Sequence, residues 1–235
     1  MVYKKLRNFY HSVRLGFWVR MKYPVTLRVA NTNDRILVHN WPTALLLKTT
    51  TTRVTQGRMF YEPIERPYFE RLARDKKVFF DLGAFVGYYS VMAHGLGVRA
   101  CYAFEIVDLF VDITEKNFSL NNIPGKVTRM ALGKPGEQIQ FEYSIFSDGG
   151  IAKSLDDFSE SANVWPDVLK IDIEGAELDT LRAMPKILKR HPALDISVHP
   201  TFLQERGQNE EEVMELLSSY GYTVIFSGGD TYFLV

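Results

Sequence analysis

Two acidic residues stand at the ends of successive apolar runs, where their carboxylates could contact a bound ligand. Asp81 follows the first run and precedes a turn that contains Gly83 and Gly87, and Glu105 ends the next run. Parallel strands end at a common edge of their sheet, where ligands bind, so we expect the two carboxylates to lie near one another. The pattern predicts a nucleotide-type site at that edge.

The type of ligand follows from the spacing of the glycines and the position of the first acid. The turn reads G-x-x-x-G rather than the G-x-G-x-x-G of dinucleotide sites, and a carboxylate beside it would repel a pyrophosphate. S-adenosylmethionine carries an ammonium, a sulfonium and a ribose but no phosphate. Asp81 could bind the ammonium directly or through water, Gly83 allows close backbone approach, and Glu105 could accept two hydrogen bonds from the ribose. The alternative is a buried strand–helix–strand unit without a ligand.

A second charged segment follows another apolar run. Lys170, Asp172 and Glu174 alternate with Leu169, Ile171 and Ile173, so in a strand the three ionisable groups share one face. Residues 176–188 continue with the apolar spacing of a helix. Three charges on one strand face are costly unless they border a cleft, which predicts a cluster that positions substrate or cofactor. The alternative is a buried ion pair that fixes the strand.

With these segments in view, the chain resembles the FkbM family of S-adenosylmethionine-dependent methyltransferases between Tyr61 and His199. The resemblance lies in residues 80–84 with 87–90, 103–105, Asn117 with Asn121, 131–133, 154–158, and 169–177 followed by 181–182. The most specific segment is Leu-Lys-Ile-Asp-Ile-Glu-Gly-Ala-Glu at 169–177. Three positions depart from the family pattern: Phe85 replaces a usual Asn, Ile106 a usual Pro, and Ser197 a usual acid.

The resemblance implies a cofactor, a reaction and a set of contact residues. The cofactor is S-adenosylmethionine, and the acceptor is a hydroxyl group of a sugar or glycan. The implied cofactor-binding residues are Asp81, Gly83, Ala84, Gly87, Glu105, Ile106, Ala131 and Leu132.

The candidates for catalysis lie at the same predicted edge. They are Asp172, Glu174 and His199, with Lys170 as a residue that could orient the two acids or be structural. An unperturbed histidine pKa of about 6.5 suits a general base at neutral pH, although a histidine before Pro200 could equally cap a helix or pack. A divalent ion held by Asp172 and His199 lacks a clear third ligand in the sequence, so no metal site is predicted.

Alternating apolar segments predict an α/β fold. We expect a doubly wound, mainly parallel sheet with strands at 77–82, 100–104, 126–131, 167–173 and 193–198, and a strand pair at 138–143 and 151–155 around a turn at Asp148-Gly149-Gly150. Helices are expected at 65–74 and 208–220. An antiparallel hairpin at 222–226 and 231–235 matches the ending that class I methyltransferases add to the Rossmann order. The catalytic domain is placed at 61–235, after an N-terminal extension, 1–60, with a basic helix at 4–22 and short strands at 25–29, 36–39 and 44–47.

Composition limits the classes of function. The 235 residues carry no net charge and include one cysteine, which excludes a disulfide framework and fits a cytoplasmic location. Residues 1–33 hold seven basic and no acidic residues. This segment could cover the catalytic domain, contact an anionic membrane, or bind an anionic acceptor. Two other functions stay open: ribose 2′-O-methylation of RNA, disfavoured by the missing basic stripe, and a non-catalytic S-adenosylmethionine-binding module.

Overall fold

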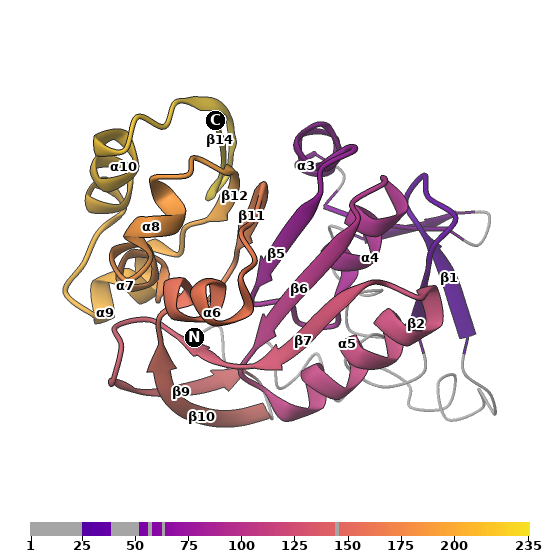
Figure 1. The fold of residues 1–235 in the computed structure, drawn as a ribbon, viewed down its shortest axis with the longest axis horizontal. Helices are drawn as coiled ribbons and strands as arrows, with labels where there is room; N and C mark the ends of the chain where they lie inside the picture. The colour runs from indigo at the N-terminus through magenta and orange to yellow at the C-terminus, as the bar shows by residue number, and fades with distance from the viewer. Residues whose placement is uncertain (1–24, 39–51, 56–57, 63, 144–145) are drawn as a thin grey trace, which may run out of the picture.

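The computed structural model describes residues 25–38, 52–55, 58–62, 64–143 and 146–235 (Figure 1). The helix predicted at 4–22 and the strand predicted at 44–47 lie outside these residues. None of the helices within the described ranges is both long enough and apolar enough to span a membrane.

A seven-stranded sheet forms the centre of the molecule (Figure 1). Its strands, from one edge to the other, are β7 (Gly125–Arg129), β6 (Ala100–Glu105), β5 (Val78–Leu82), β11 (Val168–Ile171), β12 (Ala193–Ser197), β14 (Thr231–Leu234) and β13 (Val224–Gly228). Strand β14 runs opposite to the other six strands of this sheet, so its pairings with β12 and β13 are antiparallel. The order reverses between β5 and β11, which is the switch point where α/β sheets bind ligands. The predicted doubly wound sheet with an antiparallel ending is confirmed.

Helices cover both faces of the sheet, and two apolar cores result. On one face pack α3 (Arg66–Ala73), α4 (Tyr88–Gly95) and α5 (Asp108–Asn121). On the other pack α6 (Leu155–Ala162), α7 (Glu177–Arg182), α8 (Pro185–Leu188), α9 (Pro200–Glu205) and α10 (Glu210–Ser219). Residues of β5 alternate between the cores: Phe79 joins the first, while Phe80 and Leu82 join the second. The alternation leaves Asp81 on the first face.

Local sequence signals explain where several helices begin and end. The side chain of Ser154 accepts a hydrogen bond from the Asp156 amide at the start of α6, and Asn209 forms a reciprocal capping box with Glu212 at the start of α10. The single helix predicted over 176–188 is wrong, because Pro185 starts a new helix, α8, and α7 ends at Arg182. A proline is tolerated in the first turn of a helix but not in its interior.

Two smaller sheets flank the central one. The first combines β2 (Arg35–Val38), β1 (Val25–Val29), β4 (Arg58–Tyr61) and β3 (Thr52–Thr55). Strands β3 and β4 were not predicted, and β4 crosses the predicted domain boundary at residue 60. The side chain of Asn121 joins this sheet to helix α5 of the central layer, since it accepts from the amide of Arg35 and donates to its carbonyl.

The second small sheet contains β8 (Ala131–Leu132), β10 (Phe146–Lys153) and β9 (Gln138–Tyr143). The sequence predicted a turn at Asp148-Gly149-Gly150, but these residues lie inside β10, paired with β9. The prediction of the turn is therefore wrong, since glycines at these positions sit within an extended strand. Strand β8 pairs with β10 rather than continuing β7, which ends the predicted strand at 126–131 early.

Candidate active site

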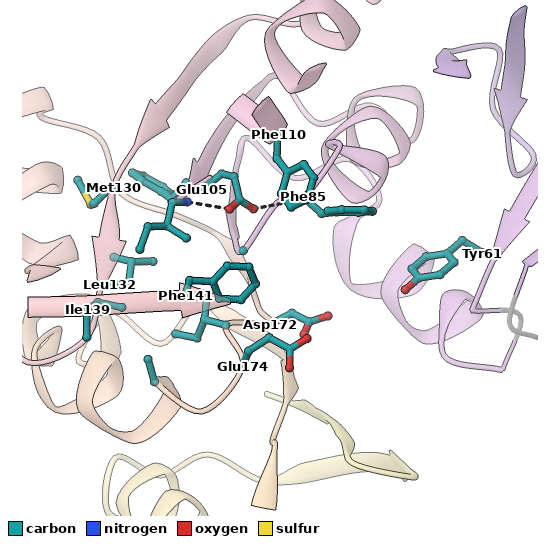
Figure 2. A pocket seen from close by; sticks show the side chains of 15 residues that line it. Tyr61, Phe85, Glu105, Phe110, Met130, Leu132, Ile139, Phe141, Asp172 and Glu174 are labelled. Carbon is teal, nitrogen blue, oxygen red and sulfur yellow. Dashed lines mark hydrogen bonds between the residues drawn. The ribbon is translucent and has the colours of Figure 1, made fainter. Parts of the chain in front are cut away.

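A cavity opens at the carboxyl ends of β5, β6 and β11, the edge at which the sequence predicted a site (Figure 2). Its lining comprises Tyr61, Gly83, Phe85, Phe104, Glu105, Ile106, Phe110, Met130, Leu132, Ile139, Phe141, Asp172, Ile173, Glu174 and Ala176. The wall is mostly apolar and aromatic, and its acidic groups are the three carboxylates of Glu105, Asp172 and Glu174. An apolar pocket with few convergent polar groups is the usual form of a small-molecule site.

Glu105 ends β6 and is held by backbone amides. Its Oε2 accepts from the amide of Phe85 at 2.8 Å, and its Oε1 accepts from the amides of Ile106 at 2.8 Å and Val107 at 3.0 Å. Burial outweighs these bonds and raises the pKa of Glu105 to about 7. A carboxylate offers about four acceptor positions, so one remains here for a ligand hydroxyl, where the sequence suggested two.

Asp81 lies deeper than expected and does not line the cavity. Its side chain is 2% exposed, and its Oδ2 accepts from both the amide of Ser90 at 3.1 Å and the hydroxyl of Ser90 at 2.7 Å. Burial raises the pKa of Asp81 to about 6, against the lowering effect of Ser90 and the charge of Lys170. Asp81 is one strand away from Glu105, since it pairs with Ala103 of β6. The sequence predicted contact between Asp81 and a ligand ammonium, directly or through water, and the structure places Asp81 behind the residues that line the cavity.

The turn after β5 brings two loops together. The amides of Gly83 and Ala84 both donate to the carbonyl of Phe104, at 2.9 and 3.2 Å. Gly83 has a φ of +78°, and a Cβ built on it would lie 1.9 Å from the carbonyl oxygen of Asp172. Gly83 is therefore needed for contact between the turn and the loop that carries Asp172.

The remaining predicted cofactor contacts divide into two groups. Ile106 and Leu132 line the cavity, whereas Ala84, Gly87 and Ala131 lie behind its wall. Gly87, with a φ of +76°, is the residue from which α4 begins. A Cβ on Gly87 would lie 2.8 Å from a methyl carbon of Thr114, so this glycine serves packing between α4 and α5.

A row of three buried charges crosses the sheet beneath the cavity. Lys170 of β11 is in register with Asp81 of β5 and with Asp195 of β12. Its Nζ lies 3.3 Å from Oδ2 of Asp172 and 4.0 Å from Oδ1 of Asp195, and 4.5 Å from the ring centre of Tyr89. Burial opposes its charge, but the carboxylates outweigh burial and raise the pKa of Lys170. Lys170 does not line the cavity and acts on Asp172.

Another part of the cavity wall carries Asp172 and Glu174. Strand β11 ends at Ile171, two residues before the predicted end, and Glu174 adopts a left-handed φ of +53°. The loop therefore brings both carboxyl groups to one side, and Figure 2 shows them next to one another and pointing the same way. Burial raises the pKa of Glu174, with Asp172 and Glu177 acting in the same direction. The predicted cluster forms, although a loop rather than strand alternation assembles it.

His199 completes this cluster from the loop after β12. Its Nδ1 lies 2.6 Å from Oε1 of the buried Glu177, while its Nε2 lies 3.5 Å from Asp172 and 3.9 Å from Glu174. Burial lowers the pKa of His199, but the bond to Glu177 and the two other carboxylates outweigh it and raise the pKa to about 9. His199 is thus charged at neutral pH, unlike the free base expected from its ordinary pKa. Its side chain makes no cap hydrogen bond to α9.

Several contributors were not recognised in the sequence. Glu177 was recognised in the sequence only as part of the segment 169–177. The side chains of Phe85, Phe110 and Phe141, which line the cavity, come from three separate segments. The ring centres of Phe85 and Phe110 are 4.4 Å apart in an edge-to-face arrangement. Only the i+3 spacing of Glu174 and Glu177 could have suggested that the two acids share a site.

The model of the methyltransferase FkbM domain matches residues 151–224. The match contains Lys170, Asp172, Glu174, Glu177 and His199, so it covers the part of the cavity wall that carries Asp172 and Glu174. It confirms the predicted family resemblance over this range. It also confirms the predicted enzyme class, a methyltransferase that uses S-adenosylmethionine. The segments that carry Asp81 and Glu105 lie outside the match.

No curated protein matches the chain. Among solved structures, it is similar to a ribosomal protein L11 methylase from Lactobacillus delbrueckii subsp. bulgaricus, with 17% identity, coverage of 72% of this chain and 73% of that one, and a TM-score of 0.46. It is also similar to a precorrin-6y C5,15-methyltransferase from Geobacter metallireducens GS-15, with 14% identity, coverage of 74% of this chain and 86% of that one, and a TM-score of 0.46. A third similar structure is an rRNA methylase from Streptococcus thermophilus, with 13% identity, coverage of 73% of this chain and 92% of that one, and a TM-score of 0.44. The order of the strands in the central sheet, rather than these similarities, establishes the α/β fold.

Proposed function

We propose that this protein transfers the methyl group of S-adenosylmethionine to a hydroxyl group of a sugar or glycan. One observation carries the proposal: Glu105 at the end of β6 and Asp172 and Glu174 after β11 line a single cavity. The end of the cavity that carries Glu105 suits a ribose. The end that carries Asp172 and Glu174, here called the acceptor side, suits an acceptor hydroxyl whose proton must be removed. The family resemblance supplies the class of acceptor.

The cavity residues fit the proposed cofactor. The aromatic and aliphatic wall around Phe85, Phe110 and Leu132 suits an adenine ring. Oε2 of Glu105 retains an acceptor position for a ribose hydroxyl. The negative charge of Asp81 lies beneath the turn and favours the ammonium of the cofactor above it, with a water molecule bridging the two groups.

The cofactor supplies an electrophilic methyl carbon on a sulfonium. During transfer the carbon–sulfur bond breaks, a carbon–oxygen bond forms, and the sulfonium becomes a neutral thioether. The acceptor hydroxyl loses its proton, and the carboxylates of Asp172 and Glu174, which line the cavity, can take it up. Holding the oxygen about 3–3.5 Å from the methyl carbon can supply about 7–11 kcal/mol, and proton removal contributes about 10²–10⁴-fold.

The charge of the acceptor side favours a neutral polyol over RNA. Asp172 and Glu174 face the cavity, and Glu177 lies directly behind His199. A polyphosphate backbone would approach this group of acids at an electrostatic cost, since RNA binding normally uses a basic surface. Neutral sugar hydroxyls can instead donate hydrogen bonds to carboxylates.

Transfer of a radiolabelled methyl group tests the proposal. The purified full chain is incubated with methyl-labelled S-adenosylmethionine and with a pool of oligosaccharides or, separately, with RNA. We expect label in the oligosaccharides and none in RNA, and the label should survive mild alkali because a methyl ether is stable where a methyl ester is not. Label in RNA alone would replace the proposed acceptor class.

Two variants separate chemistry from folding. Asp172→Asn should retain affinity for S-adenosylhomocysteine but reduce transfer by about 10²-fold or more. Asp112→Asn makes the same change on the exposed side of α5 and should leave both quantities unchanged. Saturable cofactor binding with no transfer to any acceptor would support a non-catalytic module instead.

A further inference from the structure

We propose that Asp172, Glu174 and His199 form a binding site for one divalent cation of the Mn²⁺–Zn²⁺ series. Each of the three residues offers one ligand atom, and these atoms all lie within 4.8 Å of one another. Nε2 of His199 faces Oδ1 of Asp172 and Oε2 of Glu174. The mixed set of one imidazole and two carboxylates suits first-row divalent ions, which accept both nitrogen and oxygen ligands.

The distances are close to those that an ion requires. Metal–ligand bonds of about 2.1 Å at tetrahedral angles place the ligand atoms about 3.4 Å apart. His199 Nε2 lies 3.5 Å from Asp172 and 3.9 Å from Glu174. Small rotations of the Glu174 side chain, which is 33% exposed, would close the remaining gap.

His199 is oriented as metal-binding histidines are. Metal-ligating imidazoles use one ring nitrogen for the ion and donate the other to a carboxylate or carbonyl. Nδ1 of His199 lies 2.6 Å from Glu177, whose side chain is fully buried, and this contact turns Nε2 toward Asp172 and Glu174. Glu177 is itself positioned by the amide of Gly175, which donates to its Oε1 at 3.0 Å.

Asp172 is held from its other side. Its Oδ2 is 3.3 Å from the ammonium of Lys170, which leaves Oδ1 toward His199. Supporting contacts of this kind orient ligating carboxylates in metal sites. Glu174 has a left-handed φ of +53°, and the following Gly175 lies so close to Phe202 that an added Cβ would lie 2.4 Å from the Cβ of Phe202.

The charge around this site is in surplus on the negative side. Three carboxylates, Asp172, Glu174 and Glu177, surround one imidazole, and Lys170 is shared with Asp195. Oε2 of Glu177 is buried and has no hydrogen-bond partner among the described residues. A divalent ion bound between these carboxylates would offset this charge.

The position of the ion gives it a role that rests on the proposed methyl transfer. Asp172 and Glu174 line the same cavity as Glu105, so open coordination positions of the ion would face the acceptor. A bound cation lowers the pKa of a hydroxyl that coordinates it, which would ease loss of the acceptor proton to a nearby carboxylate or water. The existence of the site does not depend on this role.

Titration of Mn²⁺ into the full chain, stripped of metal with a chelator, tests the site directly. Free Mn²⁺ is counted by electron paramagnetic resonance, and affinity for S-adenosylhomocysteine is measured on the same samples by calorimetry. We expect one saturable ion per chain. Asp172→Asn and Glu174→Gln should weaken Mn²⁺ binding at least about tenfold, and Glu177→Gln about 10–100-fold. The exposed Asp112→Asn and Glu115→Gln variants on α5 should bind as the unchanged protein does.

Each outcome decides between the site and the proposed function. A folded chain that binds S-adenosylhomocysteine but takes up no Mn²⁺ at millimolar concentration would overturn the cation site and leave the methyl-transfer proposal intact. Mn²⁺ binding that Glu174→Gln and Glu177→Gln both leave unchanged would place the ion elsewhere and also overturn the site. Saturable Mn²⁺ binding that these variants weaken, in a chain without affinity for S-adenosylhomocysteine, would support the site and reject the proposed function.

Discussion

Lys170 and Asp195 are register partners on neighbouring parallel strands, and both side chains are buried, with Nζ 4.0 Å from Oδ1. Asp81 is in register on the other side of Lys170, and Asp172 lies above it at 3.3 Å. One ammonium therefore interacts with four carboxylates, those of Asp195, Asp172, Glu62 and Asp81, and each of them raises its pKa. Removal of the ammonium should have a different effect from removal of one carboxylate, since a buried charge without a partner is costly.

Lys170→Met should destabilise the protein by about 3–5 kcal/mol, because the buried Asp81 and Asp195 and the half-buried Asp172 lose their cation. Asp195→Asn should cost less, since Asp81 and Asp172 remain beside Lys170. Urea unfolding at pH 7 would measure both values. At pH 5 the deficit of Lys170→Met should shrink, because burial raises the pKa of Asp81 to about 6 and that of Asp195 to about 7 and both then take up protons. Equal losses in the two variants at pH 7 would contradict this account.

Affinity for S-adenosylhomocysteine should fall as pH decreases from 8 to 5.5. Binding needs the ionised forms of Asp81 and Glu105, whose pKa values burial raises to about 6 and about 7. Because these exceed the unfolded values of 3.8 and 4.5, the stabilising effect of the two groups is complete below about pH 4 and is lost as pH rises through 6–7. Bound ligand offsets this loss of folding stability only at a pH at which Asp81 and Glu105 are ionised.

The expected decrease in affinity is about tenfold or more over this range, since one pKa unit corresponds to a tenfold change. Calorimetry at several pH values would measure it. Glu105→Gln should bind more weakly at pH 8 and move the midpoint of the pH dependence down, toward the pKa of Asp81. A pH-independent affinity in the unchanged protein would show that neither carboxylate contacts the ligand through its charge.

The sequence predicted the sheet well because strand identity depends on apolar runs. The runs that became β5, β6, β11 and β12 are long and bounded by charged or turn residues, so their positions were predicted within a few residues. The helix at 176–188 was overextended because its apolar spacing continues across Pro185. Glycines 149 and 150 suggested a turn, but pairing of β10 with β9 overrides that local preference.

The candidate site was predicted only in part, for a physical reason. Types of residue at strand ends identify which carboxylates gather, but not how deep each one lies. Asp81 precedes the last residue of β5 and points into the helix layer, where Ser90 binds it. Glu105 is the last residue of β6 and reaches the cavity. The pairing of His199 with Glu177 joins two segments 22 residues apart, and no spacing rule predicts such a contact from the sequence.

Phe85→Asn should be more stable than Phe85→Val by about 1–2 kcal/mol, because a left-handed backbone is costly for β-branched residues. Phe85 has a φ of +52°, and asparagine tolerates this conformation. Both substitutions remove the ring that packs on Phe110, so their difference isolates the backbone contribution. Urea unfolding would measure it, and equal stabilities would mean that the turn changes its conformation when the ring is lost.

Gly83→Ala should reduce methyl transfer about 10²-fold, since a misplacement of about 1 Å can have this effect. The added Cβ would lie 1.9 Å from the carbonyl oxygen of Asp172, so the turn after β5 and the loop after β11 must separate. Gly136→Ala is the matched control: its φ is +86°, but no described atom lies within 4 Å of an added Cβ. Both variants share the conformational penalty of a left-handed alanine, and only Gly83→Ala has the clash. If the two variants lost transfer and affinity for S-adenosylhomocysteine to the same extent, contact between these loops would not be what positions Asp172 against the cofactor.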